Sequence, residues 1–563
     1  MLGRSNNTNP VSVEVDGMIK TKPIDIANHF ADHYEQKVNN LRSNMHVNAS
    51  NESLVGNIDS QIMSGKTCCF VLPDISLDEI TNILLLLPEN KSPGYDFIDN
   101  KLMKYAAQYI ARPVTYLFNL SLKQGKFPTE WKQAKICPIP KDAKSAFTAP
   151  NSRPISLLSS LSKILEKVVS DHIWNYMETN NLFTHTQHAY RKNHSTETVL
   201  IDMTDAWLHA LDQGKIVSIL LLDFSAAFDL IDHTILVKKL SHYGFSQNSI
   251  NWMKSYLYGR KQSVYVNGSF SSPRSTTCGI PQGSCLGPLL YIIYTNDLPL
   301  VLMDSNANMF ADDTTITAVA ESQTQLYDYL ANDFKRVVEW VENNKLVLNT
   351  NKTKNMVICT NKKRKRLGPW SLTYGGVQID EVSEVKLLGV RIQNNLSWTA
   401  HITDLSKRVS KMAGMVGRIA GLISKDTLKV VSHSLIYSHI NYCCVVWGNA
   451  ALRDMKSLQI TLNKAARMVL KCGYEIGTSE LHSMMGWPTV LECVRQQAIA
   501  LISKIQMSNK PVSIRSRLTL VRDGHQVNTR SRQKNHYVVA KIKTVMGSRS
   551  FIFWAVKLWN SLR

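Results

Sequence analysis

Two adjacent carboxylates, Asp312 and Asp313, lie in the stretch NMFADDTTIT between apolar and β-branched residues. Neighbouring like charges repel each other, and carboxylates are costly to remove from water. A third acid, Asp223, closes the apolar run IVSILLLDF, where a charge is expensive unless it is paired or metal-bound. Each feature alone is more often a solvated turn or a strand-end cap. Together, three carboxylates from two strands can hold two Mg²⁺ ions, an arrangement that stabilises phosphoryl transfer.

The elements that must position these acids are predicted to be strands. The β-branched-rich run 216–224 is typical of a strand buried on both faces, and residues 308–320 predict a hairpin with the acidic pair at its tip. RKQSVYVNGSFSSPRSTTCG predicts two strands joined by an Asn-Gly turn. Helical patterns surround them, one capped by Ser76 and another ending at Gly125. An α+β middle with an antiparallel sheet therefore precedes a mostly helical, basic region beyond residue 400.

Composition narrows the class of protein. A chain of 563 residues is too long for one hydrophobic core, so several domains are expected. No apolar run reaches the roughly 20 residues that span a bilayer, and the polar N-terminus lacks a signal-peptide core. The ten cysteines lack zinc-finger spacing, which favours free thiols in a reducing compartment. We therefore expect a cytoplasmic or nuclear protein that is not secreted and does not enter a membrane.

Charge is distributed unevenly. Residues 1–100 hold 7 Lys and Arg against 13 Asp and Glu, whereas residues 501–563 hold 13 against 1. A basic region of this kind favours a polyanionic partner, nucleic acid first, although general solubility explains it as well. The run KKRKR at 362–366 could be a nuclear-localisation or nucleic-acid patch, but we predict a solvated loop between strands.

The ordered motifs resemble one family. LLLDFSAAFDLIDH, GIPQGSCLGPLLYIIYTNDL and MFADDTTI are similar to the successive palm motifs of reverse transcriptases, most closely those of non-LTR (LINE-like) retrotransposons of the jockey and chicken-repeat type. NKSPGYDFI, NSRPISLLSSLSKILEKVV and QHAYRKNHSTETVL resemble the fingers motifs. WVENNKLVLNTNKTKNMVI and VKLLGVRIQNNLSWTAHI resemble the two motifs after the palm acids, and GSRSFIFWAVKLWNSL resembles the rear of such polyproteins. The resemblance covers about residue 20 to the end.

This resemblance implies an α+β right-hand polymerase with fingers, palm and thumb, an antiparallel palm sheet and a helical basic C-terminal region. The implied domains are a linker and N-terminal helix at 1–70, fingers and the start of the palm at 71–215, the palm at 216–400, the thumb at 401–475 and the basic C-terminal region at 476–563. Relatives usually carry an endonuclease upstream, which nothing here resembles. We therefore expect the chain to be a 5′-truncated element or a gene-model fragment.

The resemblance also assigns roles around the acids. Asp223, Asp312 and Asp313 would be the catalytic residues and ligate two metal ions, with the Phe224 carbonyl as a backbone ligand. Asp313 is the less essential partner in some polymerases of this kind. The implied cofactor is Mg²⁺, with Mn²⁺ as a substitute.

The nucleotide-binding residues follow in the same way. Phe228 stands where reverse transcriptases place a bulky aromatic residue that clashes with a ribose 2′-OH, though core packing also explains an aromatic residue after a strand. In GIPQGS, the resemblance places Gln282 and Gly283 against the incoming nucleotide and template, because glycine permits a close backbone approach. An ordinary Gly/Pro turn before a helix is the alternative reading.

Three cations complete the implied nucleotide site. Lys141 and Arg153 match fingers residues that hold a triphosphate, for which the Arg fork is well suited. Lys352 matches a general acid for the pyrophosphate leaving group. Taken alone, Lys141 and Arg153 are each more readily surface cations, and a solvated-loop lysine explains Lys352 nearly as well.

The expected function is RNA-directed DNA synthesis with an RNA template, a DNA primer and dNTPs as partners. The main alternative is a catalytically inactive nucleic-acid-binding remnant of a truncated retroelement. An intron-encoded or retron-like enzyme fits the C-terminal stretch less well, and an RNA replicase is disfavoured by Phe228.

Overall fold

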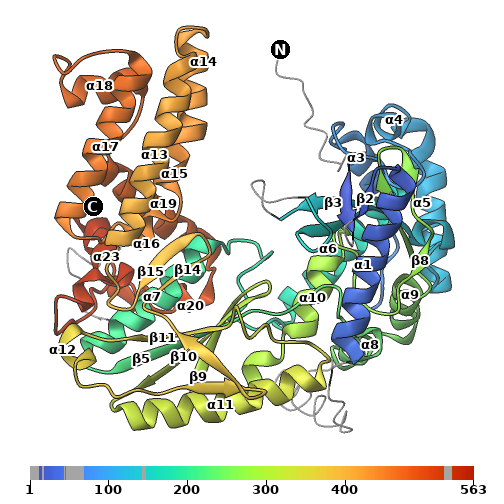
Figure 1. The fold of residues 1–563 in the computed structure, drawn as a ribbon, viewed down its shortest axis with the longest axis horizontal. Coiled ribbons are helices and arrows are strands. Elements are labelled where there is room, and N and C mark those ends of the chain that lie inside the picture. Colours follow the sequence, from blue (N-terminus) through green and yellow to red (C-terminus); the bar gives the residue numbers. More distant parts are fainter. Residues whose placement is uncertain are drawn as a thin grey trace. The chain divides into compact units, whose positions relative to one another are not determined.

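The computed structural model describes residues 12–15, 18–43, 45, 69–141, 147–524 and 536–562. Much of the predicted N-terminal linker, residues 1–11 and 46–68, lies outside this part. The chain forms two compact units that alternate along the sequence. Unit 1 comprises Met1–Thr184, Phe224–Met303 and Lys335–Asn349, and unit 2 comprises His185–Asp223, Asp304–Phe334 and Thr350–Arg563. Figure 1 gives the element labels used below.

Unit 1 contains a five-stranded sheet in the order β4-β3-β6-β7, with β8 also pairing with β6. Its strands are β3 (Gln133–Pro140), β4 (Ser152–Leu157), β6 (Lys261–Val266), β7 (Ser269–Phe270) and β8 (Arg274–Ser275). Asn267 and Gly268, between β6 and β7, have φ values of 44° and 88°. Positive φ at both positions belongs to a two-residue hairpin turn, so the predicted hairpin with an Asn-Gly turn is confirmed.

The predicted N-terminal helix is α1 (Pro23–Ser43), and it belongs to the core of unit 1. Its buried face, including Ile26 and Phe30, packs with Ile136 and Val264 of the sheet. An amphipathic helix of this kind is stabilised mainly by such burial rather than by intrinsic propensity. Near its C-terminal end, Arg42 pairs with Asp232 at 3.0 Å, which fixes α1 to the start of α8.

Two other helices of unit 1 confirm an expected start and an expected end. Ser76 caps α3 by accepting a hydrogen bond from the Glu79 amide at 3.1 Å, and Gly125 ends α5 with a φ of 62°. Besides α1 and the five-stranded sheet, the main strands and helices of unit 1 are β1 (Val13–Val15), β2 (Met18–Lys20), α3 (Leu77–Leu85), α4 (Asn100–Tyr105), α5 (Ala107–Gln124), α6 (Ser160–Thr179), α8 (His233–His242), α9 (Gln247–Leu257) and α10 (Gly287–Thr295).

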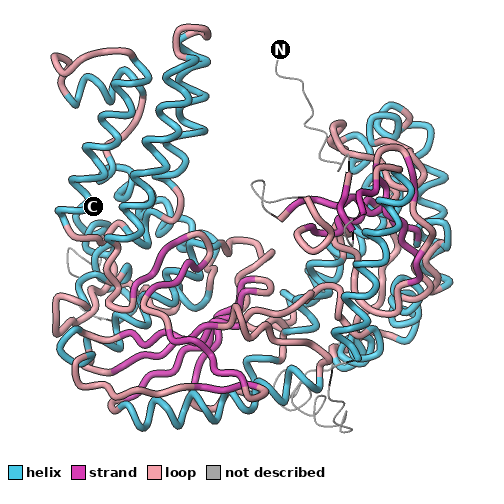
Figure 2. Tube along the Cα trace, viewed as in Figure 1, coloured by secondary structure: helices cyan, strands magenta, loops and turns pink. Residues whose placement is uncertain are grey.

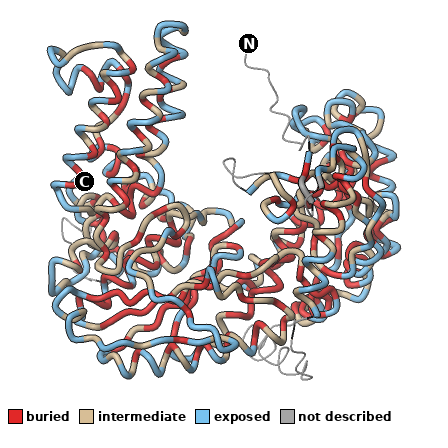
Figure 3. The backbone as a smooth tube through the Cα atoms, in the orientation of Figure 1, coloured by how far each residue is buried: buried red, intermediate tan, exposed pale blue. Residues whose placement is uncertain are grey.

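Unit 2 is built on a six-stranded sheet in the order β12-β13-β11-β5-β10-β9. Its strands are β5 (Ile216–Leu222), β9 (Ser305–Phe310), β10 (Asp313–Ala320), β11 (Lys354–Ile358), β12 (Leu372–Tyr374) and β13 (Val377–Glu381). The run predicted as a buried strand is β5, which is antiparallel to both of its neighbours and buried almost throughout (Figure 3). The α+β class is confirmed, and only the β11–β13 pair departs from the predicted antiparallel sheet.

Helix α7 (Thr196–Asp212) packs against β5 and β9. Its indole Trp207 Nε1 donates to Thr317 Oγ1 at 3.2 Å, which anchors the helix on the sheet. Helix α11 (Gln323–Asn343) carries the predicted strong periodicity, and Figure 1 shows its first part, residues 323–334 of unit 2, along the opposite side of the sheet from α7. The sheet of unit 2 is therefore covered on both sides, as the apolar character of β5 requires.

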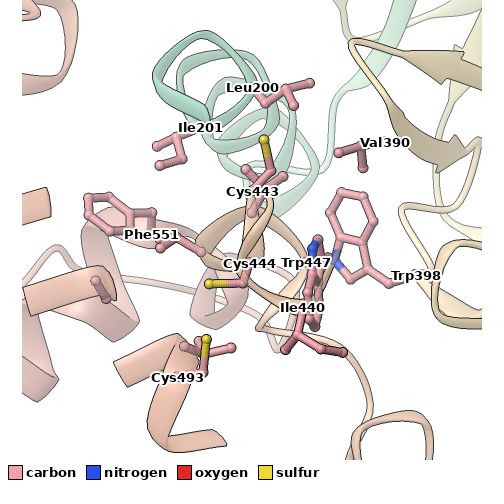
Figure 4. Packing of buried hydrophobic residues seen from close by; sticks show 14 of the residues in the cluster. Leu200, Ile201, Val390, Trp398, Ile440, Cys443, Cys444, Trp447, Cys493 and Phe551 are labelled. Atoms are coloured by element: carbon pink, nitrogen blue, oxygen red, sulfur yellow. The ribbon is translucent and has the colours of Figure 1, made fainter. Parts of the chain in front are cut away.

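Beyond a hairpin of β14 (Glu384–Leu387) and β15 (Val390–Gln393), unit 2 is mostly helical (Figure 2). Its main helices are α13 (Thr399–Ile419), α14 (Lys425–Ser432), α16 (Cys444–Trp447), α17 (Leu452–Leu470), α18 (Thr478–Met485), α19 (Val490–Ser508) and α23 (Phe551–Leu562). One continuous apolar core joins them to α7, β5 and β11. Figure 4 shows part of it, where Cys443 and Cys444 lie between α7 and the C-terminal helices.

Two further expectations can be compared with the described residues. The nine cysteines in this part are unpaired, in agreement with free thiols, and none of its helices is long and apolar enough to cross a membrane. The prediction of a loop at KKRKR is wrong for its first residues, because Asn361–Arg364 form the short helix α12. Thr360 caps this helix by accepting from the Lys363 amide at 3.4 Å.

Candidate active site

Three acids converge at one end of the unit 2 sheet. Asp223 directly follows β5, and Asp313 is the first residue of the adjacent β10. In their register Leu222 lies opposite Thr314, so the residues next to this pair, Asp223 and Asp313, lie at the same end of the ladder. The central position of β5 thus places Asp223 beside the acidic pair.

The acidic pair occupies a strained turn. Phe310 pairs with Asp313, which leaves Ala311 and Asp312 as the two residues of the hairpin loop, as predicted. Ala311 has a φ of 57°, a left-handed conformation usually taken by glycine. A non-glycine residue there costs about 1–3 kcal/mol, and such strain is often kept near functional groups. The tight turn holds both Asp312 and Asp313 at the surface.

The electrostatics of the three acids are mutually unfavourable. Partial burial, with smaller contributions from the charges of Asp312 and Asp223, raises the pKa of Asp313 to about 6, and the charge of Lys352 opposes this shift. Lys352 Nζ lies 3.4 Å from Asp223 Oδ2, and the Asp223 amide donates to Thr353 Oγ1 at 3.4 Å. One exposed lysine therefore faces three carboxylates, which leaves a surplus of negative charge.

This surplus can be compared with the needs of a divalent cation. Every side-chain donor in the set is a carboxylate oxygen, the ligand type that Mg²⁺ and Mn²⁺ accept. Among the residues that the structure describes, however, no three His, Cys, Asp or Glu side chains are gathered into a finished metal cluster. The acids fit an oxygen-seeking cation in donor type and charge, and binding would have to draw their side chains together.

In unit 1 the segment after Phe224 is bonded to the GIPQGS loop. The Ile280 amide donates to the Phe228 carbonyl at 3.0 Å, and Gln282 Nε2 donates to Asp229 Oδ1 at 2.8 Å. Gly279 is required here because a Cβ would come within 2.7 Å of the Asp229 carbonyl oxygen. Two motifs separated by about 50 residues in the sequence therefore form one local structure.

Phe228 and Gly283 each make a protein contact. The Phe228 ring stacks on Tyr291, with ring centroids 4.7 Å apart and planes at 11°, so it is half-buried rather than free. Gly283 has a φ of 126°, and a Cβ there would lie 2.5 Å from the Ser156 carbonyl oxygen. The close approach that Gly283 permits in this structure is thus to β4.

The two fingers-like cations lie on one face of the β3–β4 ladder. Arg153 pairs with Ile139, and Lys141 follows two residues later, where its amide donates to the Asn151 carbonyl at 2.9 Å. Alternation along a strand puts both side chains on the same face. Ser152, Pro154 and Ser156 line a cavity of about 380 Å³ on the other face, together with Gln282 and Asp229.

Nine of the ten predicted residues thus fall into two groups. Asp223, Asp312, Asp313 and Lys352 meet within unit 2, whereas Lys141, Arg153, Phe228, Gln282 and Gly283 belong to unit 1. The tenth, Phe224, is the first residue of its unit 1 segment, is buried and pairs with Leu348 in an isolated bridge.

Two participants were missed. Asp229 follows Phe228 directly and accepts a hydrogen bond from the side-chain amide of Gln282. Gln187 stands in the motif QHAYRKNHSTETVL, and its Oε1 accepts from the Ala311 amide at 3.2 Å. Their motifs pointed to both segments, but no local pattern could show which partner each side chain would take.

Comparison with known proteins identifies a domain within the chain. Residues 139–392 match the family described as reverse transcriptase (RNA-dependent DNA polymerase). The chain therefore carries a reverse transcriptase domain, related to those of non-LTR retrotransposons, and the resemblance expected from its motifs is confirmed.

Individual relatives come from insect transposons. The chain is 28% identical to the "Probable RNA-directed DNA polymerase from transposon X-element" of Drosophila melanogaster, over 75% of the chain and 46% of that protein. It is 28% identical to the corresponding protein of transposon BS from the same species, over 83% and 52%. It is 27% identical to the RNA-directed DNA polymerase from mobile element jockey of Drosophila funebris, over 75% and 47%. The chain thus spans about half the length of these curated relatives.

Proposed function

We propose that this chain is an RNA-directed DNA polymerase that adds dNTPs to a primer 3′-OH on an RNA template. The observation that carries the proposal is the convergence of Asp223 with the turn of Asp312 and Asp313, inside a reverse transcriptase domain. Three carboxylates with a single facing lysine are costly in a protein that binds no cation. Nucleotidyl transfer would use such a cluster of carboxylates to bind the metal ions that stabilise the transferred phosphate.

In this proposal Asp223, Asp312 and Asp313 bind two divalent ions, Mg²⁺ or in its place Mn²⁺, with the Phe224 carbonyl as a further ligand. When bound, such a pair stabilises the attacking and leaving oxygens of the transferred phosphate. Lys352, whose Nζ lies 3.4 Å from Asp223 Oδ2, would give a proton to the pyrophosphate leaving group. The strained turn at Ala311 holds the two adjacent acids in a fixed relation.

The residues of unit 1 would select and hold the nucleotide. Lys141 and Arg153, on one face of the β3–β4 ladder, are suited to a triphosphate. Phe228 would exclude a ribose 2′-OH, and its stacking on Tyr291 would keep the ring from yielding. Gln282 and Gly283 would face the nucleotide and template, on a loop that Asp229 and Ser156 hold in place.

The same proposal names the parts of a right-hand polymerase. Fingers and the start of the palm would span 71–215, the palm 216–400 and the thumb 401–475, followed by a basic region at 476–563. The six-stranded sheet that carries the acids suits a palm, and α13 and α17, which pack closely together, suit a thumb.

Primer extension tests the proposal. The purified chain should extend a DNA primer on an RNA template with dNTPs and Mg²⁺, and should use rNTPs much less well. Asp312→Ala should abolish extension while leaving the melting temperature unchanged, because Asp312 is exposed at a turn. Template binding without extension by the wild-type chain would favour the alternative, an inactive nucleic-acid-binding remnant.

A further inference from the structure

The segment Thr186–His188 lies beside the edge strand that leads to the acidic turn. The Met309 amide donates to the Thr186 carbonyl and the His188 amide donates to the Met309 carbonyl, both at 2.9 Å. Gln187 and Met309 form an isolated parallel bridge. This segment therefore extends the sheet at β9, two residues before the turn begins.

Gln187 reaches from this segment to the turn itself. Its Oε1 accepts from the Ala311 amide at 3.2 Å and from the Ala189 amide, two residues further along the chain, at 2.9 Å. The side chain is 1% exposed, so water does not compete for these bonds. Gln187 thus contacts the residue whose φ of 57° is the strained point of the hairpin.

Resting on the polymerase function proposed above, we propose that Gln187 is a positioning residue for Asp312 and Asp313. Its carboxamide oxygen holds the Ala311 amide and so keeps the turn in the conformation that directs both carboxylates. Without that bond the strained turn would gain freedom, since an alanine at positive φ has better conformations available. Gln187 would then influence the rate of transfer without touching substrate.

The nitrogen of the Gln187 carboxamide allows a variant that tests the role of the oxygen separately. Gln187 Nε2 is buried and has no hydrogen-bond partner within the described residues. Burial favours the neutral form of a carboxyl group, so Gln187→Glu replaces this nitrogen by a hydroxyl oxygen, removes no bond and retains an acceptor for the two amides. Gln187→Met has a similar length but no acceptor oxygen. Gln187→Asn keeps the amide and withdraws it by one methylene, which serves if the Met variant does not fold.

A matched control lies elsewhere in unit 2. Gln459 Oε1 accepts from the Val490 amide at 2.8 Å, the same type of side chain to backbone bond, between α17 and α19. Gln459→Met removes that bond and also the contacts of Gln459 Nε2 with Asn463 Oδ1 at 2.7 Å and His482 Nε2 at 3.1 Å, without altering the hairpin. It therefore reports the effect on the unit as a whole of losing at least as many side-chain bonds as the Gln187 variants lose.

Backbone hydrogen exchange of the 308–314 segment, measured without metal, is the first readout. We expect exchange at the Ala311 amide to rise about tenfold in Gln187→Met and Gln187→Asn, and to stay within threefold of wild type in Gln187→Glu and Gln459→Met. The second readout is steady-state extension: kcat should fall about tenfold in the Met and Asn variants while the KM for dNTP changes less than twofold, and Gln187→Glu should retain more than a third of kcat.

Unchanged exchange in both the Met and Asn variants would overturn the proposal, and so would equal defects in Gln187→Glu and Gln187→Met. If the wild-type chain extends no primer, the polymerase proposal fails. The exchange measurement then still decides whether Gln187 holds the turn, so the two failures can be told apart.

Discussion

Asp313 in the acidic turn and Asp205 in α7 have their pKa values raised to the same level, about 6, in opposite surroundings. Burial is the largest cause for both. Around Asp205, the charge of Arg517 and two backbone amides favour the ionised carboxylate and so oppose the rise in its pKa. Apart from burial, only the charge of Asp202 adds to that rise. Around Asp313 two carboxylates add to the shift, and only Lys352 opposes it.

The partners of Asp205 explain its burial. Its Oδ1 accepts from the Phe551 amide at 2.6 Å and its Oδ2 from the Ile552 amide at 3.1 Å, at the start of α23. A carboxylate at a helix N-terminus satisfies amides that have no partner within the helix. A raised pKa alone therefore does not identify a reactive acid. The charge of the surrounding groups distinguishes the structural carboxylate Asp205 from Asp313, which is suited to bind a cation.

The largest expected effect tests this division directly. Asp223→Asn should lower the rate of primer extension about 1000-fold, because loss of a metal-binding charge costs several kcal/mol in the transition state. The urea unfolding curve should not shift to lower concentration, since the substitution relieves repulsion with Asp313. Extension within tenfold of wild type would remove Asp223 from the site.

Asp205→Ala should show the reverse behaviour. Two amides of α23 would lose their acceptor in a buried place, at a cost of about 3 kcal/mol in unfolding free energy. Chemical unfolding followed by protease sensitivity of the 551–562 segment measures this loss. Extension assayed at low temperature, where the variant remains folded, should stay near wild type.

The pH dependence of stability sharpens the comparison at Asp205. Because its pKa is about 6 when folded and about 3.8 when unfolded, the folded state binds more protons between these values. Stability should therefore fall as pH rises from about 4 to about 6, by about 2 kcal/mol from this group. Unfolding of Asp205→Asn over the same range should lack this component, and parallel curves for the two proteins would contradict the assignment.

The smallest effect concerns Asp313, the second acid of the pair. Asp313→Asn should reduce extension about tenfold, less than Asp223→Asn, if Asp313 is the less essential ligand. Single-turnover extension at saturating Mg²⁺ measures the ratio. A loss as large as that of Asp223→Asn would make the two acids equal partners.

Local signals explain what could be predicted from the sequence. The strand β5, the acidic hairpin and the Asn-Gly turn follow from residues that lie within a few positions of one another, so their patterns revealed them. The convergence of Asp223 with the acidic pair was reached through the order of motifs. The bond from Gln187 to Ala311 spans 124 residues and that from Asp205 to Phe551 spans 346, and periodicity carries no information on such pairings. The KKRKR helix was missed because the capping role of Thr360 outweighed the expectation of a charged loop.

The attachment of the C-terminal segment to α7 has a consequence for biosynthesis. Besides the Asp205 bonds, Asp212 accepts from the amides of Lys543 and Thr544, so Asp205 and Asp212 of α7 both depend on partners more than 300 residues downstream. At a synthesis rate of about 5–20 residues per second, that delay is roughly 20–70 s. Until then the helix behind the acid-bearing sheet lacks its final cover, and the nascent chain must be kept from aggregating. Unit 2 can complete its apolar core only after α23 has been synthesised.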